Sequence, residues 1–205
     1  MPNIEGFILA GGASSRMGED KSRMLLGGRT FVEIIADALR PVASSVSLVS
    51  SRPEASAHGL PVVQDVFDGR GAIGGLHTAL ARCEARWALV VSCDLPFVTP
   101  ELFARLASLL CDETDAVAPL QNDGRQQPLC SLYAVAPCRA TAEELIRADE
   151  LRPRELLRRV RTRWVAFHEL SDLTGSALFF HNVNTPEDYK LATRKGEKGE
   201  ASGAG

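Results

Sequence analysis

Short apolar segments alternate with amphipathic segments along most of this chain, and the alternation limits the folds that it can adopt. Strands are expected at Ile4–Leu9, Ser45–Val49, Leu60–Val63, Trp87–Ser92, Ala116–Pro119 and Cys130–Val135. Helices are expected between them, at Thr30–Leu39, Ile73–Cys83, Pro100–Leu110, Arg139–Ala148 and Arg154–Val160. Strands that alternate with helices predict βαβ units and a parallel sheet. We therefore expect an α/β fold, a three-layer α/β/α sandwich around a mostly parallel sheet.

The last part of the chain is less regular. Strands are expected at Trp164–Phe167 and Ala177–Val183, and a closing helix at Pro186–Thr193, with proline in its first turn. Residues 195–205 are small, charged and rich in glycine, so they cannot bury apolar surface and are expected to be disordered. The sequence thus predicts one domain over residues 1–194 and a polar tail over 195–205.

Composition excludes several classes of function. The net charge of −3 gives no basic field, so nucleic acid is not an expected partner. No apolar run approaches the roughly 18 residues that span a membrane, and the N-terminus does not resemble a secretory signal. The 5 cysteines are odd in number and form no C-x-x-C pair, which argues against a disulfide framework or a zinc site. Free thiols fit the reducing cytoplasm, where we expect the protein to act.

A glycine-rich, basic loop follows the first expected strand. Gly11 and Gly12 come directly after Ile4–Leu9 and Ala10, and Arg16 and Lys21 follow within the next ten residues. Backbone N–H groups without a Cβ cover can approach phosphate oxygens, and the two cations can neutralise them. A glycine pair alone would indicate an ordinary turn. The spacing differs from a Walker P-loop, but the whole stretch predicts a site for a nucleoside triphosphate.

Two carboxylates are expected at the same edge of the sheet. Asp94 follows the apolar strand Trp87–Ser92, and Asp65 follows the third strand. Ligands of open α/β sheets bind outside the carboxyl ends of the strands, where a carboxylate is well placed to hold Mg²⁺. The alternative interpretations are that Asp94 caps the next helix and that Asp65 is a turn residue.

The segment around Gly69 fits two patterns. Gly69, Gly71 and Gly74 match G-x-G-x-x-G, and Asp94 lies 20 residues beyond Gly74, as in a dinucleotide-binding fingerprint. That fingerprint needs a glycine directly after the strand, whereas residues 64–68 intervene here. The sequence therefore argues against NAD binding. Gly74 and Gly75 are instead expected to open a helix whose N-terminus faces an anion.

Five ordered motifs within residues 4–192 resemble those of the MobA-like nucleotidyltransferases, and most closely the molybdenum cofactor guanylyltransferases. The first is L-A-G-G-x-S-x-R-M-G-x-D-K, which ends at Lys21, and the second resembles G-P-L-x-G with Ala72 in place of proline. The third is C-D-x-P around Asp94, and the fourth is Q-P-L-x-x-L-Y from Gln127. The fifth is N-x-N-T-P-E-D from Asn182.

The resemblance implies a Rossmann-like sheet of the nucleotide-diphospho-sugar-transferase type and a reaction. In this reaction the terminal phosphate of molybdopterin, with or without molybdenum, attacks GTP and releases pyrophosphate. Mg²⁺ is the implied cofactor, and apo-molybdoenzymes or cofactor-delivery proteins are possible partners. The implied catalytic residues are Arg16, Lys21 and Asp94, with Asp94 as metal ligand. The implied nucleotide site comprises Leu9, Ala10, Gly11, Gly12, Lys21, Asp65 and Asp94, and the implied acceptor site comprises Gly74, Gly75, Gln127, Asn182 and Asn184.

Three alternatives stay open. A cytidylyltransferase of the same cofactor, or a relative with another phosphate acceptor, would share the fold and the mechanism. Gly12 favours GTP, because guanine-using members of the resembled family typically have L-A-G-G where cytosine-using members have L-A-A-G. A nucleotide-sensing module without catalytic activity is the third, which the combination of Arg16, Lys21 and Asp94 disfavours.

Overall fold

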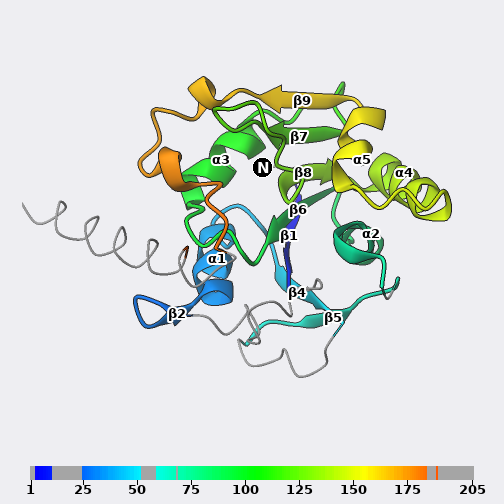
Figure 1. Cartoon of the computed structure of the whole chain (residues 1–205), viewed down its shortest axis with the longest axis horizontal. Helices are drawn as coiled ribbons and strands as arrows, with labels where there is room; N and C mark the ends of the chain where they lie inside the picture. The colour runs from blue at the N-terminus through cyan, green and yellow to red at the C-terminus, as the bar shows by residue number, and fades with distance from the viewer. Residues whose placement is uncertain (1–2, 11–24, 52–58, 68, 184–187, 189–205) are drawn as a thin grey trace, which may run out of the picture.

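A seven-stranded sheet forms the centre of the molecule, in a computed structural model that describes residues 3–10, 25–51, 59–67, 69–183 and 188 (Figure 1). The sheet order is β5-β4-β1-β6-β8-β7-β9. Within the described sheet, β8 alone runs against its neighbours. The strands are β1 Ile4–Leu9, β4 Val46–Ser50, β5 Val62–Gln64, β6 Trp87–Ser92, β7 Ala116–Pro119, β8 Cys130–Ala134 and β9 Thr162–Val165. The expected mostly parallel α/β fold is confirmed.

Helices cover both faces of this sheet, which gives the expected three layers. Helices α1 and α3 lie on one face, and α2, α4 and α5 lie on the other (Figure 1). The helices are α1 Phe31–Leu39, α2 Gly71–Arg82, α3 Pro100–Ser108, α4 Val135–Arg147 and α5 Pro153–Arg159. Side chains of β1 alternate between the two cores: Ile4 and Ile8 pack on the side of α1, and Phe7 and Leu9 on the side of α2.

Side-chain caps set the starts of two helices. Thr30 and Glu33 form a capping box at α1, where the Glu33 N–H donates to Thr30 Oγ1 (3.2 Å) and the Thr30 N–H donates to Glu33 Oε2 (2.8 Å). Thr99 caps α3 by accepting a hydrogen bond from the N–H of Leu102 (3.3 Å), and Pro100 occupies the first turn. Both helices therefore begin within one residue of their expected starts.

The segment Ala177–Val183 is not the strand that its apolar residues suggested. It contains the end of a short 3₁₀ helix, Ser176–Leu178, and then turns. Gly175 begins the turn with φ of 79°, and the N–H of His181 donates to the carbonyl of Leu178 (2.9 Å). Hydrogen bonds within the segment replace a strand ladder, while Phe179 is fully buried through packing.

Other boundaries differ by a few residues. The strand expected at Trp164–Phe167 is Thr162–Val165, since a 3₁₀ turn starts at Phe167. Helix α4 begins four residues before the expected Arg139, because Pro137 is tolerated in its first turn. The hairpin of β2 Leu25–Leu26 and β3 Arg29–Thr30 was not anticipated.

Some expectations fall outside the described residues. They are most of the helix at Pro186–Thr193 and the tail at 195–205, so the domain boundary at residue 194 stays a prediction. Among the described helices, none has the length and hydropathy needed to cross a membrane.

The burial of the cysteines gives a first test of the fold. Iodoacetamide at pH 8 should modify Cys111 before the other thiols, because Cys111 is exposed whereas Cys93, Cys130 and Cys138 are buried. Burial also raises the pKa of Cys83, Cys130 and Cys138 to about 12, and the thiolate is the reacting form. Mass spectrometry of digested protein would measure the order of labelling, with urea-unfolded protein as the control. Protection of Cys111 in the folded protein would contradict this structure.

Candidate active site

The centre of the sheet has a topological switch point at the carboxyl ends of β1 and β6. These strands pair in parallel, with Leu9 beside Ser92, and the sheet continues through β4 on one side and β8 on the other. The N–H of Cys93 donates to the carbonyl of Leu9 (3.1 Å), so the segments that follow β1 and β6 start side by side. Open α/β sheets bind ligands at such a point. Ala10 follows Leu9 and Asp94 follows Cys93, so both lie at this edge, as the sequence predicted.

Asp94 joins this point to a segment from the far end of the chain. Its Oδ2 accepts a hydrogen bond from Asn182 Nδ2 (3.2 Å), and its carbonyl accepts one from the N–H of Val183 (2.9 Å). The structure thus brings together Asp94 and Asn182, which the sequence assigned to the metal site and the acceptor site.

The second carboxylate oxygen of Asp94 is suited to a cation. Oδ1 is buried, and no described residue donates a hydrogen bond to it. A buried acceptor without a partner costs about 1–3 kcal/mol, and more when it is charged. No cluster of three metal-ligating side chains occurs among the described residues. A cation at Asp94 would therefore take most of its ligands from substrate and water, and Mg²⁺ commonly binds proteins in this way.

Asp65 has a structural role in the described contacts. Its Oδ1 accepts hydrogen bonds from the N–H of Phe67 (3.2 Å) and from Thr78 Oγ1 (2.7 Å). Thr78 Oγ1 in turn accepts a hydrogen bond from the N–H of Val66 (2.8 Å). These bonds fasten the loop after β5 to α2. Three strand spacings, about 14 Å, separate the ends of β5 and β6, so Asp65 lies on a different part of the edge from Asp94.

Gly74 and Gly75 do not open α2, as the sequence had suggested, because the helix starts at Gly71. Both are buried within it, and their surroundings differ. A Cβ on Gly74 would lie 2.9 Å from the carbonyl oxygen of Phe67, whereas one on Gly75 would make ordinary contacts of at least 3.6 Å with Leu9. Gly74 therefore lets α2 approach the loop that Asp65 holds. Acceptor binding by the two glycines stays a prediction.

Gln127 lies in the connection between β7 and β8, on the other half of the edge. Its N–H donates to the carbonyl of Pro119 (3.1 Å), and its own carbonyl accepts from Ser131 Oγ (2.7 Å). The neighbouring Gln126 has a buried Oε1 without a hydrogen-bond donor among the described residues. Gln126 was not among the expected site residues, because adjacent glutamines in a sequence give no sign of which one has a buried side-chain oxygen.

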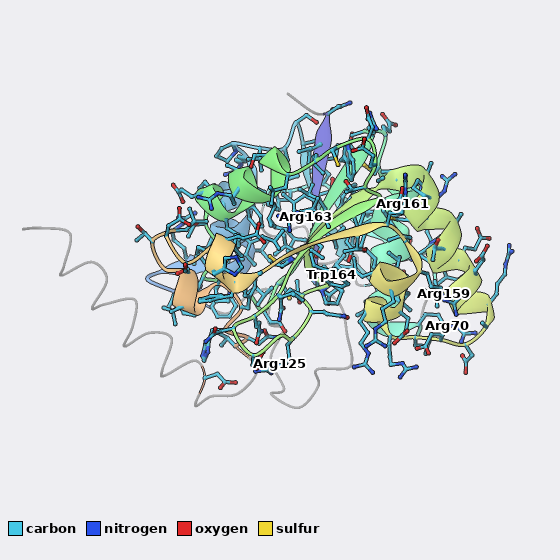
Figure 2. All side chains as sticks on the ribbon, turned by 90° about the horizontal axis from the view of Figure 1, so that it is seen from above. Arg70, Arg125, Arg159, Arg161, Arg163 and Trp164 are labelled. Atoms are coloured by element: carbon cyan, nitrogen blue, oxygen red, sulfur yellow. The ribbon has the colours of Figure 1, made fainter. Side chains whose placement is uncertain are left out.

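Several arginines of the described residues are engaged in ion pairs, some at this edge and some elsewhere on the sheet. Figure 2 labels Arg125 on the β7–β8 connection, Arg70 before α2, and Arg161 and Arg163 around β9. The ion pairs are Arg125–Asp123, Arg70–Asp149, Arg161–Asp115 and Arg163–Glu169. Hydrogen bonds from Arg161 hold the pKa of the Asp115 carboxyl below its usual value. These arginines are therefore less suited to bind a substrate phosphate than cations without a carboxylate partner would be.

Five of the expected site residues lie outside the described residues: Gly11, Gly12, Arg16, Lys21 and Asn184. Leu9 and Ala10, which precede this loop, are in place at the end of β1. The N–H of Ala10 donates to the carbonyl of Val49 (2.9 Å), and Leu9 is buried. The roles of all these residues stay predictions.

Comparisons with known proteins agree on one family. Residues 6–164 match the sequence model of the MobA-like NTP transferase domain. A probable molybdenum cofactor guanylyltransferase of a Geobacillus species is 31% identical over 195 residues, which cover 92% of this chain and 97% of the relative. A protein of the same name from Pelotomaculum thermopropionicum is 35% identical over 193 residues, covering 94% and 93%.

Solved structures support the fold. Molybdopterin-guanine dinucleotide biosynthesis protein A from Archaeoglobus fulgidus superposes with a TM-score of 0.79 at 24% identity, covering 95% of this chain and 99% of that chain. The 2-C-methyl-D-erythritol 4-phosphate cytidylyltransferase of Thermus thermophilus gives a TM-score of 0.69 at 21% identity, covering 95% and 99%. At these identities the two structures establish a shared nucleotidyltransferase fold.

The two buried glycines of α2 provide a matched test of how this loop is built. Gly74→Ala should lower the free energy of unfolding by about 1–3 kcal/mol, because a backbone oxygen must move away from the new methyl group. Gly75→Ala should be neutral or stabilising by up to about 1 kcal/mol, since alanine favours the helix. Urea titrations followed by circular dichroism would measure both. Equal effects of the two changes would contradict the close approach at Gly74.

Proposed function

This chain belongs to the family of MobA-like NTP transferase domains, and from that premise we propose that it transfers GMP from GTP to the terminal phosphate of molybdopterin. The names of its relatives support guanine as the base and the molybdenum cofactor as the acceptor. The observation that carries the proposal is Asp94, which presents a buried carboxylate oxygen at the switch point, without a hydrogen-bond donor among the described residues.

The reaction needs charge stabilisation more than acid–base chemistry. An anionic oxygen of the acceptor phosphate forms a bond to the α-phosphorus of GTP, and the bond from that phosphorus to the bridging oxygen breaks as pyrophosphate leaves. Both reactants are anions, so catalysis depends on positioning and on nearby positive charge. Asp94 would hold Mg²⁺ through Oδ1, and the bound ion would offset negative charge on the phosphate oxygens.

The remaining roles follow the order of elements along the edge. We assign the nucleotide to the half formed by β1, β4 and β5, where Leu9 and Ala10 lead into Gly11 and Gly12. Arg16 would neutralise the departing β- and γ-phosphates, and Lys21 would contact the α-phosphate. Acceptor binding falls to the half formed by β6, β8 and β7, with Gln127 and Asn184. Gln126 adds a buried amide oxygen to that half, suited to an N–H donor of a pterin ring.

The wider setting is part of the same proposal. GTP and molybdopterin, with or without molybdenum, are the substrates, and apo-molybdoenzymes or cofactor-delivery proteins are the macromolecular partners. We place the reaction in the cytoplasm, which the free thiols favour.

Pyrophosphate release tests the reaction and the role of Asp94 together. With Mg²⁺ and molybdopterin, GTP should give faster release than CTP. Asp94→Asn should lower kcat by about 100-fold or more while nucleotide affinity falls much less, because the lost charge acts mainly in the transition state. Release with CTP alone would identify a cytidylyltransferase. If the wild-type protein showed no turnover and Asp94→Asn changed only nucleotide binding, the result would favour a sensing module.

Gly12→Ala tests the choice of base. The added methyl group should lower kcat/KM for GTP relative to CTP, if the absence of a side chain at position 12 admits the larger purine. Steady-state kinetics with both nucleotides would measure the ratio, and Ala13→Gly in the same loop provides a comparison. A ratio equal to that of the wild-type protein would remove Gly12 as the determinant.

A further inference from the structure

We propose that Asn182 is a positioning residue, which holds the Asp94 carboxylate so that Oδ1 is presented to the metal ion. This inference rests on the proposed function, in which Asp94 binds Mg²⁺. It assigns to Asn182 an action on the metal site, whereas the sequence motif suggested a contact with the acceptor.

The two oxygens of Asp94 have different surroundings. Oδ2 accepts the hydrogen bond from Asn182 Nδ2 at 3.2 Å, and Oδ1 is buried without a donor among the described residues. Rotation of the carboxylate about its bond to Cβ would move both oxygens out of these positions. The amide of Asn182 opposes this rotation, because its hydrogen bond holds one oxygen in place. The bond therefore fixes the position in which the other oxygen is presented to a cation.

Asn182 is itself held in place by its neighbours. The N–H of Val183 donates to the carbonyl of Asp94 (2.9 Å), so the backbones of the two residues are joined as well as their side chains. Val183 is fully buried against Phe31, with Phe97 and Leu26 packed around them. On the other side, the ring of His181 lies 6.2 Å from that of Phe97. Asn182 thus projects from a segment that is anchored before and after it.

A neutral donor is the suitable group for this task. An ionised carboxylate accepts hydrogen bonds only, and the amide of asparagine supplies a donor without neutralising the charge that a cation needs. A lysine or arginine at position 182 would compete with the ion for Asp94. An aspartate would bring a second negative charge to a carboxylate oxygen and could donate nothing when ionised. Groups that orient a metal ligand in this way typically affect metal affinity by 10- to 100-fold.

The test measures how strongly Mg²⁺ increases nucleotide affinity, without any acceptor present. Isothermal titration calorimetry would give the Kd of GTP and of CTP in Mg²⁺ and in EDTA, and the ratio of the two values reports the metal site. We expect Asn182→Ala to lower this ratio about 10-fold or more, towards that of Asp94→Asn. Asn122→Ala is the matched control, because Asn122 is an exposed asparagine in the β7–β8 connection.

Two further measurements separate positioning from acceptor binding and from damage to the fold. The Mg²⁺ concentration for half-maximal turnover should rise in Asn182→Ala, while the KM for molybdopterin changes little. Thermal unfolding of the variants should match that of the wild-type protein, since the Asn182 side chain is exposed.

Several outcomes would overturn the proposal. One is an Asn182→Ala variant in which Mg²⁺ increases nucleotide affinity as much as in the wild-type protein. Another is an increase confined to the KM for molybdopterin, which would assign Asn182 to the acceptor site. A wild type whose nucleotide affinity does not depend on Mg²⁺ would also exclude it. Failure of the guanylyltransferase assignment would look different, because CTP would then replace GTP in turnover while the effect of Asn182 on the metal remained.

Discussion

The parallel pairing of β1 with β6 is the constraint on which the rest of the site depends. From β1 the chain continues to β4 on one side of this pair of strands, and from β6 it continues to β7 on the other side, which makes the point between their carboxyl ends a topological switch point. The hydrogen bond from Cys93 to the carbonyl of Leu9 extends the pairing beyond the ladder by one residue. This hydrogen bond places Asp94 close to Ala10, the residue that precedes the glycine-rich segment. Helices on both faces fix these strands, and the resulting platform can hold a carboxylate where two anionic substrates would meet.

The carboxyl edge of the sheet has two halves, and Asp94 lies between them. The segment from His181 to Val183 contacts Asp94. Because this segment forms no strand ladder, its backbone and side-chain donors are available for other acceptors. Two of them bind Asp94, one from the Val183 N–H and one from the Asn182 amide. Packing of Val183 against Phe31 also fastens the segment to the start of α1, directly after the β2–β3 hairpin. Asp94, the motif that begins at Asn182 and the start of α1 therefore share one set of contacts.

Sequence periodicity was sufficient for the sheet and for the position of Asp94, because buried parallel strands are continuous apolar runs that end where ligands bind. It failed for Ala177–Val183, where Phe179 and Phe180 are buried in the core on the side of α1 and α3 while Gly175 starts a turn. The need for glycine at position 74 could not be predicted either. The glycine pattern suggests a ligand, whereas the atom that leaves no room for a Cβ is the backbone oxygen of Phe67. The bond between Asp94 and Asn182 spans 88 residues of sequence, so no local pattern could reveal it.

Oδ1 of Asp94, to which no described residue donates a hydrogen bond, is best understood as a cost that substrate binding would remove. Burying one carboxylate oxygen without a donor destabilises the free protein, and a neighbouring amide could have removed that cost during evolution of the sequence. Asn182 instead satisfies Oδ2 and leaves Oδ1 buried. A cation that arrived with the phosphates of a nucleotide would compensate the buried lone pairs at the moment when charge stabilisation is needed. The hydrogen bond from Asn182 would then serve the reaction indirectly, by keeping the oxygen that lacks a partner on the side where the ion binds.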